Sequence, residues 1–248
     1  MKAAQKKTAI VTGGASGIGK AIVTRLTEEN FFVISADIDK NKSLELEKSL
    51  GKDKVEALVT NVCSEENVKD LFEIVKEDFG HLDVLVNNAG IIRDNMIWNM
   101  PAEDFDLVMN INLKGPWLMC REAATLMKKQ NSGRIINIAS RAWLGNRGQS
   151  NYSSSKAGLV ALTRVLALEL GKYNVYVNAI APGLIDTPLT QVLEKDVLEK
   201  LIQAQPTRTM GKPEDVANAV AFLAAEKTQF ITGQTLYVDG GKSIGAGI

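Results

Sequence analysis

Tyr152 and Lys156 stand four residues apart in the stretch "YSSSK", at the start of a long segment with helical apolar spacing. Residues i and i+4 share one face of a helix, so a phenol and an ammonium group are placed side by side. A free tyrosine has a pKa of about 10, and a nearby ammonium lowers it by stabilising the phenolate. The pair therefore predicts a group that donates and accepts protons near the working pH. An ordinary surface pair is the alternative.

A second set of residues indicates a nucleotide site near the N-terminus. Gly13, Gly17 and Gly19 lie in "TAIVTGGASGIGKAI", between a strand-like run and a helical one. Glycine allows a tight turn and lets backbone N–H groups approach a pyrophosphate at a helix N-terminus. The spacing is G-x-x-x-G-x-G rather than the commoner G-x-G-x-x-G, and its position between strand and helix gives it weight.

Asp37 ends the second strand-like run, eighteen residues after Gly19. An acidic side chain there accepts hydrogen bonds from both ribose hydroxyls of NAD, and its charge repels the 2′-phosphate of NADP. Neither Ser16 nor Ile38 offers a compensating positive charge, so NAD(H) is expected rather than NADP(H). The alternative is that Asp37 caps the following helix, a role that Asp39 could also fill.

The elements that must position these residues are strands alternating with helices. Strand-like apolar runs are expected at 8–12, 32–37, 55–61, 82–88, 134–140, 175–182 and 235–240. Helical patterns lie between them, and the one after Lys156 is expected to end with Gly171 as its C-cap. Runs such as "DVLVNN" are apolar without alternation, as in strands covered on both faces. We expect an α/β fold: one doubly wound Rossmann domain over residues 1–248, with a mostly parallel sheet of about seven strands and helices on both faces.

Composition narrows the classes of protein that fit. The chain has 248 residues, of which 29 are Lys or Arg and 29 are Asp or Glu, so no net field attracts nucleic acid or an anionic membrane. No stretch approaches the ~20 apolar residues of a membrane span, and "MKAAQKK" precedes no signal-peptide block. Two cysteines without a CxxC pattern and a single His81 argue against a disulfide scaffold and a metal site. We expect a cytoplasmic protein that holds no metal.

The ordered set of motifs resembles the short-chain dehydrogenase/reductase family. "TGGASGIG", "NNAG" (87–90), "NINL" around Asn112, Ser140, "YSSSK" and "APG" (181–183) follow its order and spacing from about residue 6 to "YVDGG". Within the family, "NLKG", "GRIINIAS", "NYSSSKAGL" and "ITGQTLYVDGG" are most similar to the 3-oxoacyl-[acyl-carrier-protein] reductase branch. The resemblance implies an NAD(P)(H)-dependent oxidoreductase that interconverts a ketone and a secondary alcohol, best matched by reduction of a 3-oxoacyl thioester to the 3-hydroxyacyl product.

The resemblance also assigns the catalytic roles. The catalytic residues it implies are Asn112, Ser140, Tyr152 and Lys156. Ser140 would hydrogen-bond the substrate oxygen beside Tyr152 and stabilise developing oxyanion charge, while Lys156 would also hold the nicotinamide ribose. Asn112 would hold a water that continues a proton relay. The following Leu favours Asn112 over Asn110, and an Asn within a helix needs such an internal reason.

Residues after the third and fourth strands are implied to surround the adenosine. Asn87 would steady neighbouring strands, while Ala89 and Gly90 would let the ribose approach the backbone. Asn61 stands where many relatives carry Asp, and its amide oxygen can still accept a bond from the adenine amino group.

Near the C-terminal part of the chain, the resemblance places Ile185 and Thr187 against the nicotinamide carboxamide. The full set expected to bind the cofactor is Gly13, Ser16, Gly17, Ile18, Gly19, Asp37, Asn61, Val62, Asn87, Ala89, Gly90, Tyr152, Lys156, Pro182, Gly183, Ile185 and Thr187. The set expected to contact substrate is Ser140, Trp143 and Tyr152.

Residues 188–212 form a charge-rich amphipathic segment with a break at Pro206, and in the family this segment is a mobile lid over the substrate. Its apolar stripe consists of Val192, Leu193, Val197, Leu198 and Leu201. The opposite wall, "SRAWLGNRGQ", offers Trp143 and Leu144. Such walls suit an acyl chain, a ring or a steroid.

Several alternatives stay open for substrate, partner and class. Carrier-protein reductases carry basic residues at the mouth of the site, for which Lys128, Lys129, Arg134 and Lys172 are candidates. "KQNS" at 129–132 and the acidic Asp37 fit that branch less well, so an NAD-dependent catabolic alcohol or 3-hydroxyacyl-CoA dehydrogenase is the main rival. A non-catalytic nucleotide-sensing protein is more remote, because a sensor has no need of a proton relay. Helices with more than one apolar face predict a homo-oligomer, and the family implies a homotetramer.

Overall fold

The computed structural model describes residues 6–192 and 194–244, with Leu189 described by its backbone only. Seven strands form one sheet in the order β3-β2-β1-β4-β5-β6-β7, and every adjacent pair is parallel. The strands are β1 (Lys7–Thr12), β2 (Phe31–Asp37), β3 (Val55–Val59), β4 (Val84–Asn87), β5 (Gly133–Ile138), β6 (Val175–Pro182) and β7 (Thr235–Val238). The strand order reverses between β1 and β4, and such sheets bind ligands at the carboxyl ends of the strands beside that point. The expected doubly wound α/β fold is confirmed.

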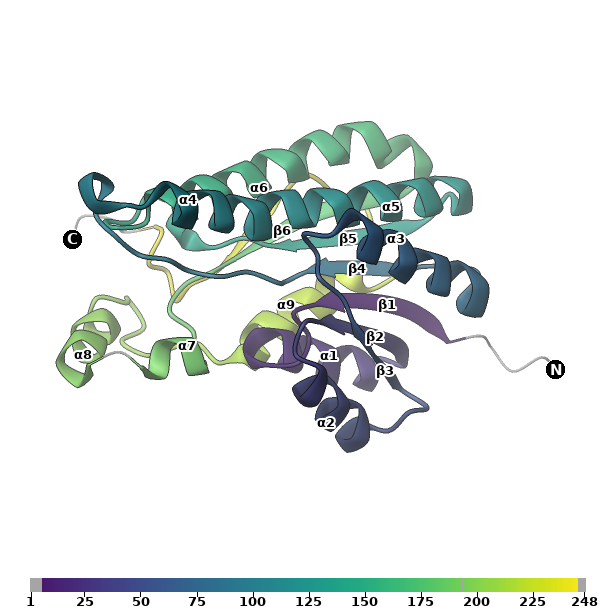
Figure 1. Cartoon of the computed structure of the whole chain (residues 1–248), viewed down its shortest axis with the longest axis horizontal. Coiled ribbons are helices and arrows are strands. Elements are labelled where there is room, and N and C mark those ends of the chain that lie inside the picture. The colour runs from purple at the N-terminus through teal and green to yellow at the C-terminus, as the bar shows by residue number, and fades with distance from the viewer. Residues whose placement is uncertain (1–5, 193, 245–248) are drawn as a thin grey trace.

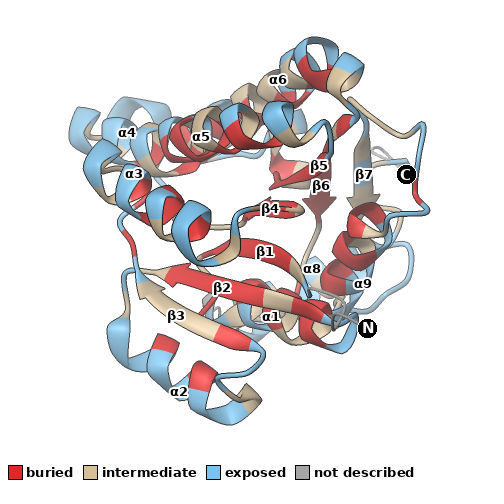
Figure 2. Cartoon of the chain, turned by 90° about the vertical axis from the view of Figure 1, so that its right-hand side faces the viewer, coloured by how far each residue is buried: buried red, intermediate tan, exposed pale blue. Residues whose placement is uncertain are grey.

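Helices cover both faces of the sheet (Figures 1 and 2). The helices are α1 (Gly17–Glu28), α2 (Lys40–Leu50), α3 (Glu65–Ile74), α4 (Ala102–Met109), α5 (Gly115–Gln130), α6 (Ser150–Leu170), α7 (Pro188–Gln191), α8 (Lys195–Gln203) and α9 (Pro213–Ala224). Shorter helical turns are η1 (Val75–Phe79), η2 (Ile97–Asn99), η3 (Asn110–Lys114), η4 (Arg141–Leu144) and η5 (Gly171–Tyr173). Helices α3, α4, α5 and α6 lie over one face, and α1, α2 and α9 lie over the other.

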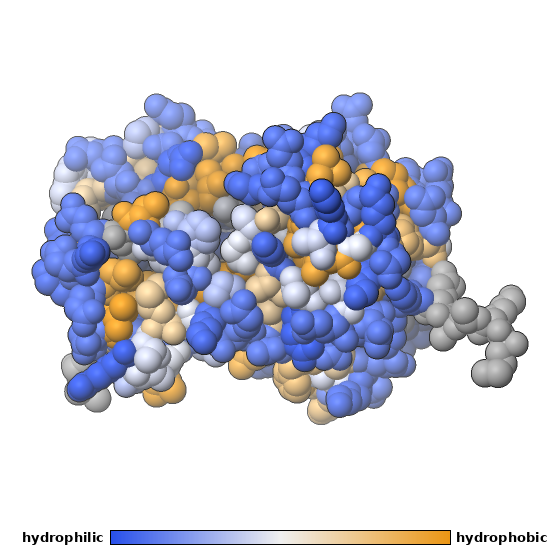
Figure 3. Space-filling view, turned by 90° about the horizontal axis from the view of Figure 1, so that it is seen from below, coloured by the Kyte–Doolittle hydropathy of each residue, from blue (hydrophilic) through white to orange (hydrophobic). Residues whose placement is uncertain are grey.

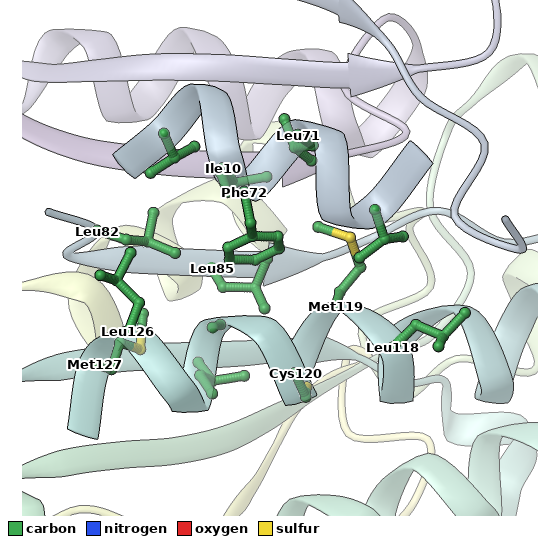
Figure 4. Packing of buried hydrophobic residues seen from close by; sticks show 14 of the residues in the cluster. Ile10, Leu71, Phe72, Leu82, Leu85, Leu118, Met119, Cys120, Leu126 and Met127 are labelled. Atoms are coloured by element: carbon green, nitrogen blue, oxygen red, sulfur yellow. The ribbon is translucent and has the colours of Figure 1, made fainter. Parts of the chain in front are cut away.

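The core under α3 and α5 follows from helical spacing in the sequence. Val68, Leu71 and Phe72 stand at positions i, i+3 and i+4 of α3 and are buried against Leu85 of β4 and Met119 of α5 (Figure 4). Strand β4 is buried at all four positions, which matches an apolar run without alternation. Burial of such side chains stabilises the fold by about 1.5–3 kcal/mol each.

The opposite face of the sheet has its own core, built between α1 and α9. Ile22 and Leu26 of α1 pack in one cluster with Val216 and Val220 of α9, and all four are fully buried. Seen from outside, this side of the molecule is mostly polar, with apolar side chains showing between polar ones toward the end that carries α7 and α8 (Figure 3). Helices therefore cover both faces of the sheet, and the edge formed by the carboxyl ends of the strands is where a site can form.

Helix α6 ends at Leu170 with Gly171 as its C-cap, as the sequence predicts. Gly171 has a right-handed φ of −53°, however, and the chain continues through η5. The left-handed residue is Asn174, whose φ is +55°. Asparagine tolerates this region because its short side chain bonds locally.

Within the part of the chain that the structure describes, no helix is long and apolar enough to cross a membrane. Over the same residues, no three His, Cys, Asp or Glu side chains form a group that could hold a metal ion.

Candidate active site

The turn between β1 and α1 brings the backbone close to whatever binds there. Gly13 and Gly17 have φ of +62° and +51°, in the region that side chains disfavour. A Cβ on Gly19 would collide with the Gly13 carbonyl oxygen and with Nδ2 of Asn88. Ser16 is the exposed N-cap of α1, and its side chain makes no capping bond. The first N–H groups of α1 are therefore available to an anion.

Two polar side chains hold this turn against β4. Nδ2 of Asn88 donates to the carbonyl oxygens of Thr12 and Gly13, both at 3.0 Å. Oγ1 of Thr12 accepts from the backbone N of Asn88 at 3.0 Å and of Ala89 at 3.1 Å. Thr12 and Asn88 lie within the motifs "TGGASGIG" and "NNAG", but the motifs assign neither side chain a role. Only the pairing of β1 with β4 brings them together.

Asp37 ends β2 beside the glycine turn, with its carboxylate held by two backbone donors. Oδ2 accepts from the N–H of Ala15 at 3.0 Å, and Oδ1 accepts from that of Asp39 at 3.0 Å. The cap of α2 is Asp39, whose Oδ1 accepts from the N–H of Lys42 at 3.1 Å. The interpretation of Asp37 as a helix cap is therefore wrong. Asp37 remains as a fixed carboxylate at the rim of the turn.

Three of the side chains that were expected to bind the cofactor point into the protein interior instead. Val62 is buried, and a Cβ on Gly115 would lie only 2.9 Å from its Cγ2. Ile18 packs against the core under α1. Asn87 is 1% exposed, and its Nδ2 donates to Oδ1 of Asn137 at 2.8 Å, which joins β4 to β5. These side chains are engaged in packing and hydrogen bonds within the sheet and its helices, so they stabilise the site without facing it.

Asn61 lies at the exposed surface just after β3. Its Oδ1 accepts from the N–H of Cys63 at 3.0 Å. An amide oxygen has two lone pairs, so one remains for the adenine amino group that the sequence expects there.

Asn112 lies in the π-helical turn η3 and not in an α-helix. Its Oδ1 accepts from the N–H of Ile91 at 2.9 Å, while Nδ2 donates to the Ile91 carbonyl at 2.9 Å and to Oγ of Ser155 at 3.3 Å. The side chain is fully buried, both of its N–H donors are used, and its oxygen accepts one bond. Turns of this kind are frequent at functional sites because they break the regular pattern of backbone bonds.

Tyr152 and Lys156 lie one turn apart at the head of α6, as the spacing predicts. Lys156 is 4% exposed, and its Nζ donates to the Ile138 carbonyl at 2.8 Å. Nζ lies 5.7 Å from the centroid of the Tyr152 ring. Ser140 follows β5, and its hydroxyl hydrogen-bonds the phenol of Tyr152.

Gly90 brings the catalytic groups into one place. A Cβ on this residue would lie 3.2 Å from Oδ1 of Asn112 and 3.5 Å from Nζ of Lys156. The four residues expected to be catalytic therefore converge from β5, η3 and α6 on the chain that leaves β4. Gly13 and Gly19 let the first turn pack tightly against its own chain and the segment after β4, and the N–H groups at the start of α1 fit the pyrophosphate of a dinucleotide.

The pKa of Tyr152 differs from the sequence expectation. Burial raises it above the ordinary value, the hydrogen bond from Ser140 lowers it, and the negative charge of Asp94 raises it further. Lys156, whose Nζ lies over the ring 5.7 Å from its centroid, does not lower this pKa, and burial lowers the pKa of Lys156 itself to about 8. Without a ligand, Tyr152 is therefore held as the neutral phenol, a proton donor.

Beyond β6, the chain runs past the site with little room to spare. The N–H of Gly183 donates to the Val238 carbonyl at 2.9 Å, and a Cβ on Gly183 would lie 2.8 Å from Cα of Asp239. Pro182 ends β6, and the side chain of Ile185 is buried in the core. Only the backbone of Ile185 is therefore available to a ligand.

Thr187 caps α7 and lies close to the glycine turn. Its N–H donates to Oγ1 of Thr190 at 2.9 Å. A Cβ on Gly17 would lie 3.8 Å from Cγ2 of Thr187. The two ends of the expected cofactor site, far apart in the sequence, thus meet.

The wall after β5 differs in part from the expectation. Trp143 packs against the small cluster of Ala139, Val160 and Ala179, where the end of β5 meets β6 and α6. Its indole therefore supports the wall from behind, and the exposed apolar side chain is that of the neighbouring Leu144, 49% exposed. The indole leans on this cluster because η4 turns back toward α6.

The segment 188–212 carries α7 and α8 below the same end of the sheet (Figure 1). None of the residues of α8, all of which are described, is buried. Val192 is 80% exposed, and Val197 and Leu201 are each 39% exposed. Leu193, the remaining strongly apolar residue of the expected stripe before α8, lies outside the described residues.

The basic residues that were expected to line the mouth of the active site lie at the opposite edge of the sheet. Lys128 and Lys129 end α5, and Lys172 lies in η5, one α6 length from Tyr152, about 30 Å for 21 residues. Arg134 begins β5 and is buried, with its guanidinium 4.4 Å from the centroid of Tyr176. The expectation that these residues line the mouth of the site is wrong within one chain, because parallel strands begin at the edge opposite to the catalytic one.

Comparisons with known proteins agree with this geometry. Residues 13–243 match a family model described as enoyl-(acyl carrier protein) reductase. The chain is 42% identical to (2S)-[(R)-hydroxy(phenyl)methyl]succinyl-CoA dehydrogenase subunit BbsD of Thauera aromatica, over 98% of this chain and 99% of the relative. It is 42% identical to 3-oxoacyl-[acyl-carrier-protein] reductase FabG of Thermotoga maritima, over 95% and 97%. A crystal structure of gox2181 superposes with a TM-score of 0.93 at 32% identity, covering 97% of this chain and 96% of that one.

Proposed function

The chain belongs to the short-chain dehydrogenase/reductase family, and we propose that it is an NAD(P)(H)-dependent oxidoreductase that interconverts a ketone and a secondary alcohol. The observation that carries this proposal is the convergence of Asn112, Ser140, Tyr152 and Lys156 beside the glycine turn. A non-catalytic nucleotide sensor fits less well, because nothing in sensing calls for a buried lysine next to a phenol.

Each catalytic side chain has a task that its surroundings support. A bound nicotinamide supplies or takes up the hydride. Tyr152 gives its proton to the carbonyl oxygen, and burial keeps that proton on the phenol until then. Ser140 donates a hydrogen bond to the same oxygen as charge develops. Lys156 holds the ribose and, with Asn112 and a water, returns the proton from solvent. Both N–H groups of the Asn112 amide are already bonded, so an oxygen of this residue would hold that water.

The substrate we propose is an acyl thioester with an oxygen function, best matched by a 3-oxoacyl thioester reduced to the 3-hydroxyacyl product. Both named relatives support a thioester: one acts on an acyl-CoA alcohol and the other on a 3-oxoacyl group of acyl carrier protein. The exposed apolar residues Leu144, Val197 and Leu201 near the site suit an acyl chain.

An NAD-dependent catabolic alcohol or 3-hydroxyacyl-CoA dehydrogenase is the second candidate, favoured by Asp37 and by the CoA relative. Turnover of matched 3-oxoacyl chains on CoA and on carrier protein, in both directions, separates the two. Carrier-protein substrates at least tenfold better in kcat/KM would support the reductase of fatty-acid type. A CoA preference would support the 3-hydroxyacyl-CoA dehydrogenase, and no turnover of either would contradict both thioester candidates and leave the alcohol dehydrogenase.

NAD(H) is the cofactor we propose, because the Asp37 carboxylate is fixed by the backbone at Ala15 and Asp39 and cannot turn away from a 2′-phosphate. The test is the ratio of kcat/KM for NADH to that for NADPH in wild type and in Asp37→Ser, which should move the ratio toward NADPH. Asp39→Asn is the matched control, since it removes a charge two residues away and keeps a good cap. A wild-type preference for NADPH would overturn the proposal.

We further propose a homotetramer in the cytoplasm. Trp117 of α5 and Val165 and Leu168 of α6 are 45%, 49% and 86% exposed, which leaves a second apolar face on both helices. A groove of about 600 Å³ runs beside Trp117, between α4, η3, α5 and α6. Light scattering should return about four times the 26.9 kDa chain mass, and a stable monomer would contradict it. Two free cysteines, Cys63 and Cys120, suit a reducing compartment.

A further inference from the structure

The segment 91–101, between β4 and α4, lies directly on the head of the catalytic helix. Asn95 pairs with Gln149 in an isolated parallel bridge, and its N–H donates to the Gly148 carbonyl at 2.9 Å. The same segment presents Ile97 and Trp98 to solvent, 69% and 73% exposed. Its position relative to α6 therefore decides where two large apolar side chains stand beside the active site.

Asp94 anchors the segment through a buried amide. Nε2 of Gln149 donates to both carboxylate oxygens of Asp94, at 3.1 and 3.0 Å. Oε1 of Gln149 accepts from Nδ2 of Asn146 at 2.9 Å, so both ends of the amide are used. Gln149 is 8% exposed and immediately precedes α6. Because hydrogen bonds to an ionised acceptor are stronger than neutral ones, the charge of Asp94 strengthens this link.

A second link lies one residue before Tyr152. Nδ2 of Asn151 donates to the Arg93 carbonyl at 2.8 Å, and Oδ1 accepts from the N–H of Tyr152 at 2.7 Å. Asn151 is fully buried. The backbone of Tyr152 and the backbone beside Asp94 are thus bound to the same side chain, and the carboxylate is held on the side of the phenol.

We propose that Asp94 is a positioning residue of this active site, which fixes the segment 91–101 against the head of α6 through Gln149 and sets a negative charge beside Tyr152. The proposal rests on the proposed function, since the charge matters to catalysis only where Tyr152 is the proton donor.

The electrostatics around Tyr152 agree with this role. Among the described residues, the charged groups around the phenol are Lys156 on its own helix and Asp94 on the facing segment, while Ser140 contributes an uncharged hydroxyl. Asp94 raises the pKa of Tyr152. Nε of the neighbouring Arg93 lies 3.8 Å from Asp104, so this guanidinium is directed to α4. The effect is to keep the phenol protonated, which favours ketone reduction.

Asp94→Asn separates charge from shape, because the amide oxygen still accepts from Gln149 while the charge is gone. Phenolate absorbance is titrated in the full-length protein, with and without Tyr152→Phe, so that the difference isolates Tyr152 from the other three tyrosines. We expect Asp94→Asn to lower the pKa of Tyr152 and the pH at which reductive kcat/KM declines, with little change in KM. Asp94→Ala should lower both and also raise KM several-fold. Asp106→Asn, which removes an exposed carboxylate on α4 and leaves the Arg93–Asp104 pair intact, should change none of these.

An unchanged Tyr152 titration in Asp94→Asn would overturn the proposal, and so would equal changes of KM in the Asn and Ala variants. The titration needs no turnover. If wild type reduces no ketone and the titration still shifts, the proposed function fails while the placement of Asp94 stands.

Discussion

The head of α6 and the segment 188–212 flank the same end of the sheet but are built in opposite ways (Figure 1). At the head of α6, Asn151, Ser155 and Lys156 are at most 4% exposed and each has a hydrogen-bond partner. In α8, none of the described side chains is buried. A saturated buried network costs much to disturb, whereas few buried contacts mean a low opening energy. We therefore propose that the reaction takes place at the head of α6 and that the segment 188–212 controls access of the substrate.

The largest expected effect is on turnover, when the phenol hydroxyl of Tyr152 at the head of α6 is removed. Tyr152→Phe removes the proton and almost no volume, so turnover should fall by about 10²–10⁴-fold while cofactor binding is retained. Steady-state rates and a cofactor titration measure the two. Tyr173→Phe, at the far end of α6, is the control and should behave as wild type. A variant that kept more than a tenth of the rate would leave less than ~1.4 kcal/mol of the barrier to this proton, against the assignment.

The next effect breaks the network without touching substrate. Asn112→Ala removes the bonds that the part-buried N–H and carbonyl of Ile91 make with this side chain, and it removes the bond that the Ser155 hydroxyl accepts, while that hydroxyl still donates to the Tyr152 carbonyl. We expect the free energy of unfolding to fall by about 2–4 kcal/mol, measured by urea denaturation. Asn110→Ala changes an exposed side chain of the same turn and should cost at most about 0.5 kcal/mol. Equal losses in the two variants would show that the network does not stabilise the turn.

Lys156→Met should have the opposite effect on stability: it should raise the free energy of unfolding, whereas Asn112→Ala lowers it. Burial lowers the pKa of Lys156 from 10.5 to about 8, so below pH 8 the folded protein carries a charge that its surroundings disfavour. Removing it should stabilise the ligand-free protein by about 1–3 kcal/mol at pH 7, while turnover is lost. Between pH 8 and 10.5 the unfolded chain binds more protons than the folded one, so wild type gains stability as pH rises.

The thermal midpoints of Lys156→Met and wild type, compared across pH 7 to 10, check this sign. The advantage of the variant should shrink through that range. Lys172→Met, at the exposed end of the same helix, should show no such trend. A Met variant less stable than wild type at pH 7 would mean that the lost bond to Ile138 outweighs the relief from the buried charge.

The smallest energies belong to the lid. Residues 188–212 should be the least protected large segment in hydrogen exchange and should gain protection with NADH and a product analogue, because closure buries their apolar stripe. Leu201→Gln should change the free energy of unfolding by less than about 0.5 kcal/mol and raise KM for substrate. Strong, equal protection with and without ligands would make this segment a permanent wall.

The sequence by itself predicted the parallel sheet and the glycine turn, and its resemblance to a known family supplied the proposed catalytic set. The pairing of Tyr152 with Lys156 rests on spacing along the chain, which helix geometry converts directly into a shared face. It also narrowed the cap of α2 to Asp37 or Asp39, but only the folded chain decided between them, because the N–H of Ala15, in the turn after β1, reaches Asp37 and the N–H of Lys42 reaches Asp39.

The tertiary structure alone decided which side chains face the site and in which direction their pKa values shift. Val62 and Asn87 turn inward because neighbouring strands and helices take their contacts. Burial raises the pKa of Tyr152 and lowers that of Lys156, so the phenol does not have the lowered pKa that the spacing predicts. Desolvation and contacts between distant segments depend on everything packed around a group, and no spacing within one stretch of sequence records them.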